Sequence, residues 1–215
     1  SRSVLKAKGL DFVAEVPVEI TDTDLNSHIA RLKDSGAETV LLWTLPRQGV
    51  ITVTSANVIG YKPNWIASFI LSDMALMHDL TKGAWEGVIF GSFATPPYDY
   101  TNEKIVKYKT ALAKYYPDVR WGVFSFAGFM YGEPFIEGLK RAGKDVTREN
   151  LIAAMNSIDA YNLIGTTLSF SEDNHQGLRS MQLLKCVGAE EYEVVSDQIT
   201  SKSDIHALVA ELEHM

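Results

Sequence analysis

The sequence predicts a doubly wound α/β fold, in which helices cover both faces of a mostly parallel sheet. Apolar runs without alternation occur at residues 39–43, 65–71 and 87–91, and such runs are typical of strands buried on both faces. Helical spacing of apolar residues occupies the intervals between these runs. Glycines and capping side chains fall at the expected helix ends, so the predicted helix ends agree with the spacing of the apolar residues.

The first strand and helix are predicted within residues 11–36. Residues 11–18 alternate in places and predict a strand, which Pro17 moves toward a sheet edge. Residues 21–24 (TDTD) offer side-chain oxygens that suit a helix N-terminus, and the apolar spacing after them is helical. Gly36 is placed to end this helix.

The same alternation continues to Gly91. A helix is expected over residues 47–59, and Asp73 is placed to cap a short helix between the strands at 65–71 and 87–91. Four strands therefore alternate with three helices, which is the pattern of a parallel α/β sheet.

The pattern changes after Gly91. Helices are predicted over residues 105–116, 124–142 and from Thr147 to residue 158, with no strand between them. Pro134 lies inside the second helix, where it indicates either a kink or a restart. Three successive helices indicate a different layer or lobe.

The last part of the chain returns to strand-like patterns. Residues 166–170 alternate, and residues 180–187 and 191–195 have the pattern of a hairpin pair. The tail from residue 203 to 215 is weakly helical in its spacing.

Composition excludes several classes of protein. The chain has 215 residues and a formal net charge of −7, so it offers no basic stripe for nucleic acid. No apolar run approaches the roughly 18 residues of a membrane helix, so no stable membrane insertion is expected. The single cysteine, Cys186, rules out an internal disulfide and a multi-cysteine zinc site.

Catalytic motifs are missing from the sequence. It contains no phosphate-binding glycine loop of either standard type and no G-x-S-x-G nucleophile elbow. The five histidines never fall at the H-x-x-x-H spacing of a helical zinc site. Asp22 and Asp24 suit a helix cap better than acid–base work. We therefore predict a protein that is not an enzyme and needs no metal or cofactor.

Aromatic residues crowd one short segment. Trp121, Phe124, Phe126, Phe129 and Tyr131 fall within eleven positions, which is more than one helix stripe can bury. Two interpretations stay open, a helix core and a ligand pocket lined by some of these rings.

Several short segments, in order along the chain, resemble segments of one protein family. They are residues 21–25 (TDTDL), 32–43 (LKDSGAETVLLW), 60–63 (GYKP), 84–88 (AWEGV), 137–143 (EGLKRAG) and 170–179 (FSEDNHQGLR). The last segment is similar to the family pattern F-D-P-x-x-H-Q-G-x-R. In order and spacing, the chain resembles type I periplasmic substrate-binding proteins, in the leucine/isoleucine/valine-binding group that serves ABC importers.

The resemblance implies a two-lobed protein with Rossmann-like lobes. Members of the family are longer, so the similarity covers only their C-terminal part, and the N-terminal part of the family fold is absent. Residues 1–91 resemble the C-terminal lobe, residues 92–185 the segment that returns to the N-terminal lobe, and residues 186–215 the crossover back and the tail.

The family's activity gives the functional expectation. Its members bind a small solute in the cleft between the lobes, close around it as a hinged clamp, and deliver it to an ABC transporter permease. A periplasmic location follows, with the signal peptide outside this chain. The alternative is a ligand-sensing domain of a receptor or regulator with the same fold, because fold alone does not settle function.

The resemblance also implies the ligand contacts. They are Thr44, Leu45 and Arg47 after one strand, Ser68, Phe69 and Ile70 after the next, and Phe124 from the other lobe. Phe69 replaces the acidic residue with which amino-acid binders hold the ligand ammonium, and an apolar pocket compensates an ammonium poorly. The expected ligand is therefore an apolar or aromatic carboxylate, with a branched-chain amino acid as the other candidate.

Arg47 is the one strong cation near the predicted contacts of this lobe. Two interpretations stay open for its guanidinium, a pair with the ligand carboxylate and a solvated position at the surface.

Overall fold

The computed structural model describes residues 2–144 and 146–200, so the predicted tail helix at 203–215 lies outside the described residues. The described chain forms two compact units. Unit 1 comprises residues 2–90, 185–189 and Thr200, and unit 2 comprises residues 91–184 and 190–199. The first change of unit falls between Phe90 and Gly91.

Unit 1 is a parallel α/β layer. Its elements are α1 (Arg2–Ala7), α2 (Asn26–Asp34), β1 (Thr39–Leu42), α3 (Pro46–Val58), β2 (Asn64–Ala67), the short 3₁₀ helix η1 (Phe69–Leu71), α4 (Met74–Thr81) and β3 (Ile89–Ser92), whose last two residues are counted with unit 2. β2 pairs in parallel with both β1 and β3, with Val40 opposite Trp65 and Ile66 opposite Ile89. The predicted alternation of parallel strands and helices is thus confirmed.

The predicted helix ends in unit 1 have a local physical basis. The Asp73 side chain accepts a hydrogen bond from the Leu76 amide and caps α4, as expected. Gly36 follows α2 with a φ of +70°, a left-handed conformation that costs glycine little. Pro46 occupies the first turn of α3, where its missing N–H is not needed.

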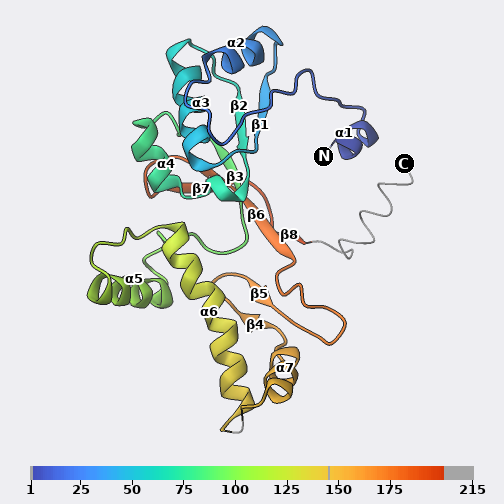
Figure 1. Ribbon diagram of the computed structural model, residues 1–215, viewed down its shortest axis with the longest axis vertical. Coiled ribbons are helices and arrows are strands. Elements are labelled where there is room, and N and C mark those ends of the chain that lie inside the picture. The colour runs from blue at the N-terminus through green and yellow to red at the C-terminus, as the bar shows by residue number, and fades with distance from the viewer. Residues whose placement is uncertain (1, 145, 201–215) are drawn as a thin grey trace. The chain divides into compact units, whose positions relative to one another are not determined.

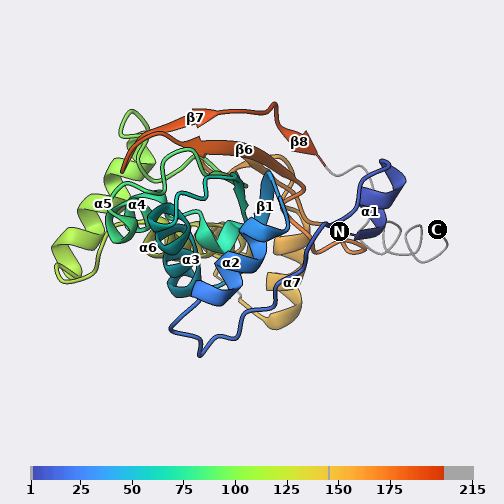
Figure 2. The same ribbon diagram turned by 90° about the horizontal axis from the view of Figure 1, so that it is seen from above.

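Three predictions for the strands of unit 1 are wrong. The strand predicted at residues 65–71 ends at Ala67, and Phe69–Leu71 form η1 instead. Residues 11–18 form no strand, since no neighbouring strand in the described chain pairs with them and Pro17 has no N–H to donate. β1 is not buried on both faces either, because Leu41 is 47% exposed whereas Val40 and Leu42 are buried. β1 ends the strand order of its sheet, and Figures 1 and 2 both show α2 and α3 beside it.

The core of unit 1 collects side chains from each strand–helix repeat. The largest fully buried ones are Trp85, Phe90, Leu25, Ile29, Leu71, Met74 and Met77. The amide of Cys186, at the end of the later strand β6 (Ser180–Cys186), donates to the Val88 carbonyl and fixes this strand end against the same core.

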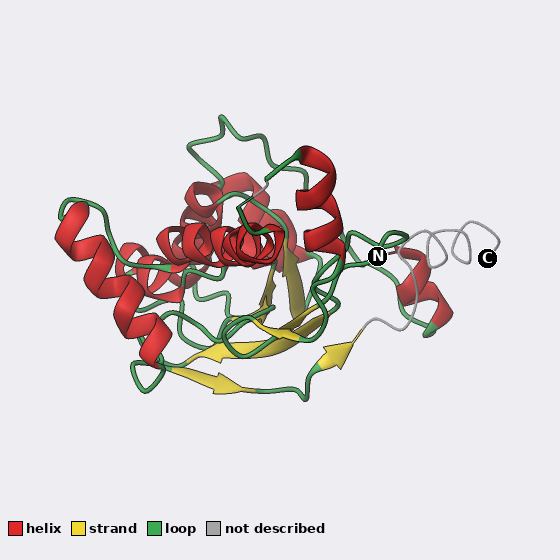
Figure 3. Ribbon diagram, turned by 90° about the horizontal axis from the view of Figure 1, so that it is seen from below, coloured by secondary structure: helices red, strands yellow, loops and turns green. Residues whose placement is uncertain are grey.

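Unit 2 is mainly helical, and Figure 3 shows how much of the described chain is helix. Its helices are α5 (Glu103–Tyr115), α6 (Val123–Ala142) and α7 (Arg148–Asn156). Its strands are the antiparallel pair β4 (Tyr161–Asn162) and β5 (Thr167–Leu168), most of β6, and β7 (Tyr192–Val194). Both β7 and β8 (Ile199–Thr200) are neighbours of β6. The three predicted helices and the neighbouring final strands are confirmed. α6 continues through Pro134 as one helix, which excludes a restart there.

The core of unit 2 joins its helices to the segment around β4 and β5. Ile105, Phe126, Met130, Leu163, Ile164 and Leu168 form the buried cluster. A polar group lies beside it, in which Glu133 accepts hydrogen bonds from the Tyr108 hydroxyl and from Lys104 Nζ. The Tyr108 ring stacks on Phe129 with ring centroids 4.6 Å apart. Of the crowded aromatics, Phe126 therefore belongs to the core.

Candidate functional site

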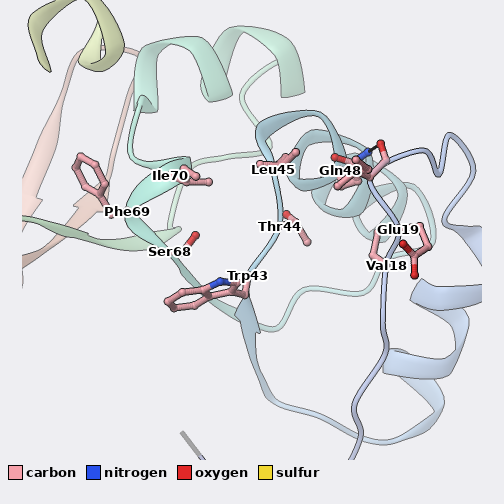
Figure 4. A pocket seen from close by; sticks show the side chains of 10 residues that line it. Val18, Glu19, Trp43, Thr44, Leu45, Gln48, Ser68, Phe69 and Ile70 are labelled. Atoms are coloured by element: carbon pink, nitrogen blue, oxygen red, sulfur yellow. Dashed lines mark hydrogen bonds between the residues drawn. The ribbon is translucent and has the colours of Figure 1, made fainter. Parts of the chain in front are cut away.

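An open pocket of about 400 Å³ lies in unit 1, at the carboxyl ends of β1 and β2 (Figure 4). Its lining comes from three stretches of chain and one helix: Val18, Glu19, Ile20, Trp43, Thr44, Leu45, Gln48, Ser68, Phe69 and Ile70. The volume falls within the range of small-molecule sites, roughly 300–1,000 Å³.

The parallel register of the sheet brings two of these stretches together. Residues 43–45 leave β1 before α3 begins at Pro46, and residues 68–70 leave β2 and turn into η1. Because β1 and β2 run in parallel, both exits lie at one edge of the sheet, where ligands of open α/β sheets bind.

The third wall of the pocket is the turn around residues 18–22. The Asp22 carboxylate accepts a hydrogen bond from the Glu19 amide at 2.8 Å, and the Asp22 amide donates to the Glu19 carbonyl. Gln48, on the first turn of α3, donates from Nε2 to the Ile20 carbonyl at 2.7 Å. Asp22 thus closes a turn rather than capping α2, whereas Asp24 accepts from the Asn26 amide at the helix start.

The pocket combines an apolar lining with a few polar atoms. Among its ten lining residues, Glu19 is acidic and none is lysine, arginine or histidine. Thr44 Oγ1 and Gln48 Oε1 are buried and have no hydrogen-bond partner among the described residues. Buried polar atoms are normally paired, so these two are the atoms to which a ligand or water would bond.

The predicted contact residues fall into two groups. Thr44, Leu45, Ser68, Phe69 and Ile70 line the pocket together. Arg47 is exposed on the first turn of α3 and is not part of the lining. Phe124 belongs to unit 2, where it is exposed on the first turn of α6.

Sequence reasoning missed half of the lining. Trp43 is 88% exposed just after β1, and its place as the last residue of an apolar run was a usable signal. Gln48 is 2% exposed and lies on the buried face of α3 with Thr52 and Ala56, at i, i+4 and i+8. A polar residue on such a face was also a usable signal. Residues 18–20 carried none, because they were assigned to a strand and its end.

Two kinds of reactive group would indicate catalysis in the described part of the chain, a metal cluster and an activated thiol. No group of three or more metal-binding side chains occurs there. Cys186 is buried and burial raises the pKa of its thiol to about 11, which leaves it unreactive as a nucleophile at neutral pH. None of the described helices is both long enough and apolar enough to cross a bilayer.

Comparison with known proteins places the whole arrangement in one family. The family described as "Periplasmic binding protein" matches residues 1–191. No curated protein sequence is a significant match to the chain.

Solved structures share the fold at low sequence identity. A fatty acid ABC transporter substrate-binding protein from Thermomonospora curvata is 23% identical with a TM-score of 0.77, over 93% of this chain and 52% of that one. A branched-chain amino acid ABC transporter protein from Thermus thermophilus with bound valine is 18% identical with a TM-score of 0.81, over 94% and 56%. A substrate-binding periplasmic protein from Ralstonia solanacearum is 19% identical with a TM-score of 0.78, over 90% and 55%. The chain spans about half the length of these structures.

Proposed function

Because the chain belongs to the periplasmic binding protein family, we propose that it is part of a solute-binding protein that delivers a small ligand to an ABC transporter permease. The observation that carries this proposal is the pocket at the carboxyl ends of β1 and β2. Membership of this family supports a periplasmic location for the protein and a permease as its partner.

The lining supports a ligand with an apolar body. Leu45, Phe69 and Ile70 present hydrocarbon and ring surface to the pocket, and burying such surface against a ligand contributes about 25 cal/mol per Å². The related structures whose names specify a fatty acid or a bound valine both concern ligands of this kind.

Polar atoms at the same place support a carboxylate on the ligand. Leu45 is the N-cap of α3 and gives no side-chain hydrogen bond to the first turn. This helix start therefore leaves its first amides without a side-chain cap, and helix N-termini favour anions. The Thr44 hydroxyl of the pocket lining has no hydrogen-bond partner among the described residues. The ligand class is a branched-chain amino acid or an apolar or aromatic acid, and Arg47 and Phe124 remain proposed contacts outside this pocket.

A binding assay tests the proposal. We expect isothermal titration calorimetry of the intact protein with amino acids and with aliphatic and aromatic acids to detect binding of at least one class. Ile70→Asp places a charge in the lining and is expected to weaken that binding by tenfold or more.

Val58→Asp is the matched control, because it makes the same kind of change at an exposed position of α3 outside the lining. Equal affinity in Ile70→Asp and Val58→Asp would remove the pocket from the proposal. Ligand uptake that is unchanged in cells lacking the gene would favour the sensing role over transport.

A further inference from the structure

Gln48 is the most completely buried polar side chain of the pocket lining, at 2% exposure. It lies on the first turn of α3, and Figure 4 shows it beside Leu45, with Val18 and Glu19 on its other side. A buried carboxamide is retained where both of its ends find partners. Only one end does so among the described residues.

Backbone carbonyls fix the orientation of this amide. Nε2 donates to the Ile20 carbonyl at 2.7 Å and approaches the Asp22 carbonyl at 3.4 Å. Both partners accept hydrogen bonds and neither can donate one to Oε1, so a flipped amide would place two acceptors against each other. Oε1 is therefore held on the branch of the amide that faces away from the 20–22 turn, and no described residue donates a hydrogen bond to it.

The charged and polar groups of the lining are mainly hydrogen-bond acceptors, like Gln48 Oε1. Glu19 brings a carboxylate to the same turn that Gln48 holds, and no lining residue carries a positive charge. Ser68 and Thr44 add hydroxyls, which can accept as well as donate. An acceptor-rich lining of this kind favours a ligand group that donates hydrogen bonds.

We propose that Gln48 Oε1 and the Glu19 carboxylate receive an N–H-bearing group of the ligand, an ammonium or an amide, at the wall formed by the 18–22 turn. The inference rests on the proposed function and narrows its ligand class. It differs from the expectation drawn from Phe69, a ligand without an ammonium group, because the acceptors lie on two other stretches of the chain. An α-amino acid then fits the pocket better than the acid that lacks the amino group.

Matched ligands separate the donor group from the rest of the molecule. The first series is leucine, 4-methylpentanoic acid and 4-methylpentanamide, and the second is phenylalanine, 3-phenylpropanoic acid and 3-phenylpropanamide. Affinities are measured on the intact protein by ¹H–¹⁵N chemical-shift titration, which also reports millimolar binding. We expect the amino acid of at least one series to bind about tenfold more tightly than its des-amino acid.

Two variants assign the effect to residues. Gln48→Met keeps the length of the side chain, removes Oε1 and Nε2, and is expected to weaken the amino acid and the amide by about tenfold each. Glu19→Gln removes only the charge, so it is expected to weaken the amino acid more than the amide, by about two- to fivefold. Glu38→Gln is the control, because it makes the same substitution at an exposed position outside the lining.

The possible outcomes test this inference separately from the proposed solute-binding function. Equal affinity for an amino acid and its des-amino acid would overturn the inference and leave the solute-binding function in place. Unchanged amino-acid affinity in a folded Gln48→Met protein would also overturn it. If that variant fails to fold, the ligand series and Glu19→Gln decide the question. Absence of binding by all six ligands would overturn the inference and the proposed ligand class together.

Discussion

The two units of the chain bury their apolar side chains in different ways. Unit 1 fills its core from successive strand–helix repeats, and its sheet edge leaves a pocket. Unit 2 fills its core from helices and a distant strand pair, with the polar group of Glu133, Tyr108 and Lys104 beside it. The comparison shows that the parallel sheet of unit 1 determines where the candidate site lies, whereas the core of unit 2 depends on contacts between segments far apart in sequence.

The largest expected effect concerns the core of unit 1. Trp85 is fully buried, so Trp85→Ala is expected to lower the free energy of unfolding by about 3–5 kcal/mol, measured by urea denaturation. Its indole N–H has no partner among the described residues, so Trp85→Phe removes an unpaired donor and should cost much less. Equal losses in the two variants would contradict a core held by ring packing.

A pair of glycines compares the backbone of the units. Gly60 in unit 1 and Gly165 in unit 2 have φ values of +69° and +80°, so alanine at either costs about 1–2 kcal/mol of strain. A Cβ at Gly165 would also collide with the Thr95 side chain, whereas a Cβ at Gly60 would meet no described atom within 4 Å. Thermal denaturation should therefore show a larger loss for Gly165→Ala, and the reverse order would contradict the packing around residue 165.

Alkaline stability distinguishes the units by their tyrosines. Burial, and then the hydrogen bond to Glu133, raise the pKa of Tyr108, and burial also raises the pKa of Tyr100, Tyr161 and Tyr192 in unit 2. Among the described residues of unit 1, burial raises the pKa of Tyr61 in the same way. The folded state keeps these protons while the unfolded chain loses them near pH 10, so their stabilising effect is full below about pH 10 and falls as the pH rises further.

Denaturation between pH 8 and pH 11 tests this asymmetry. Tyr108→Phe is expected to lose about 1 kcal/mol at neutral pH through its hydrogen bond to Glu133, and to depend less steeply on pH above 10. Tyr61→Phe is the control from unit 1, where the hydroxyl donates to the Ala37 carbonyl. A pH slope in Tyr108→Phe as steep as in the unaltered protein would count against this assignment.

The smallest effect is chemical and leaves the fold intact. Burial raises the pKa of Cys186 to about 11, so iodoacetamide should modify the native protein slowly, with a rate that still increases toward pH 11. In urea the rate should level off near the ordinary thiol value of about 8.5. Mass spectrometry follows both reactions. If the modification rate of the native protein levels off at the same pH as that of the unfolded protein, the burial of Cys186 at the end of β6 would be contradicted.

Local patterns were sufficient for most elements of the fold. The capped start of α4, the end of α2 before Gly36 and the helices of unit 2 follow from short-range spacing, which needs no tertiary partner. The strand predicted at residues 11–18 was wrong because a strand forms only by pairing with a neighbour, and the local sequence does not specify that neighbour. The exposure of Leu41 depends in the same way on tertiary structure, because it is set by what covers that face of β1.

The candidate site was predictable where it follows strand ends. The family resemblance predicted residues 44–45 and 68–70 as contacts that follow two strands, and the parallel pairing of β1 and β2 puts both strand ends at one sheet edge. The burial of Gln48 on a polar–apolar helix face could have been noticed in the sequence, but its contact with the 18–22 turn depends on a long-range hydrogen bond, and Glu19 gave no such signal. The ligand chemistry expected from Phe69 therefore took no account of these two residues.

Trp43 gives the pocket an intrinsic optical label. Of the four tryptophans, it is the one exposed at the pocket rim, whereas Trp85 is fully buried and Trp65 is buried in β2. A ligand that covers the Trp43 ring would remove water from it and shift its fluorescence toward shorter wavelength, while the emission of the buried rings stays constant. Trp43→Phe would silence that change, so occupancy of the pocket can be followed in real time without a dye.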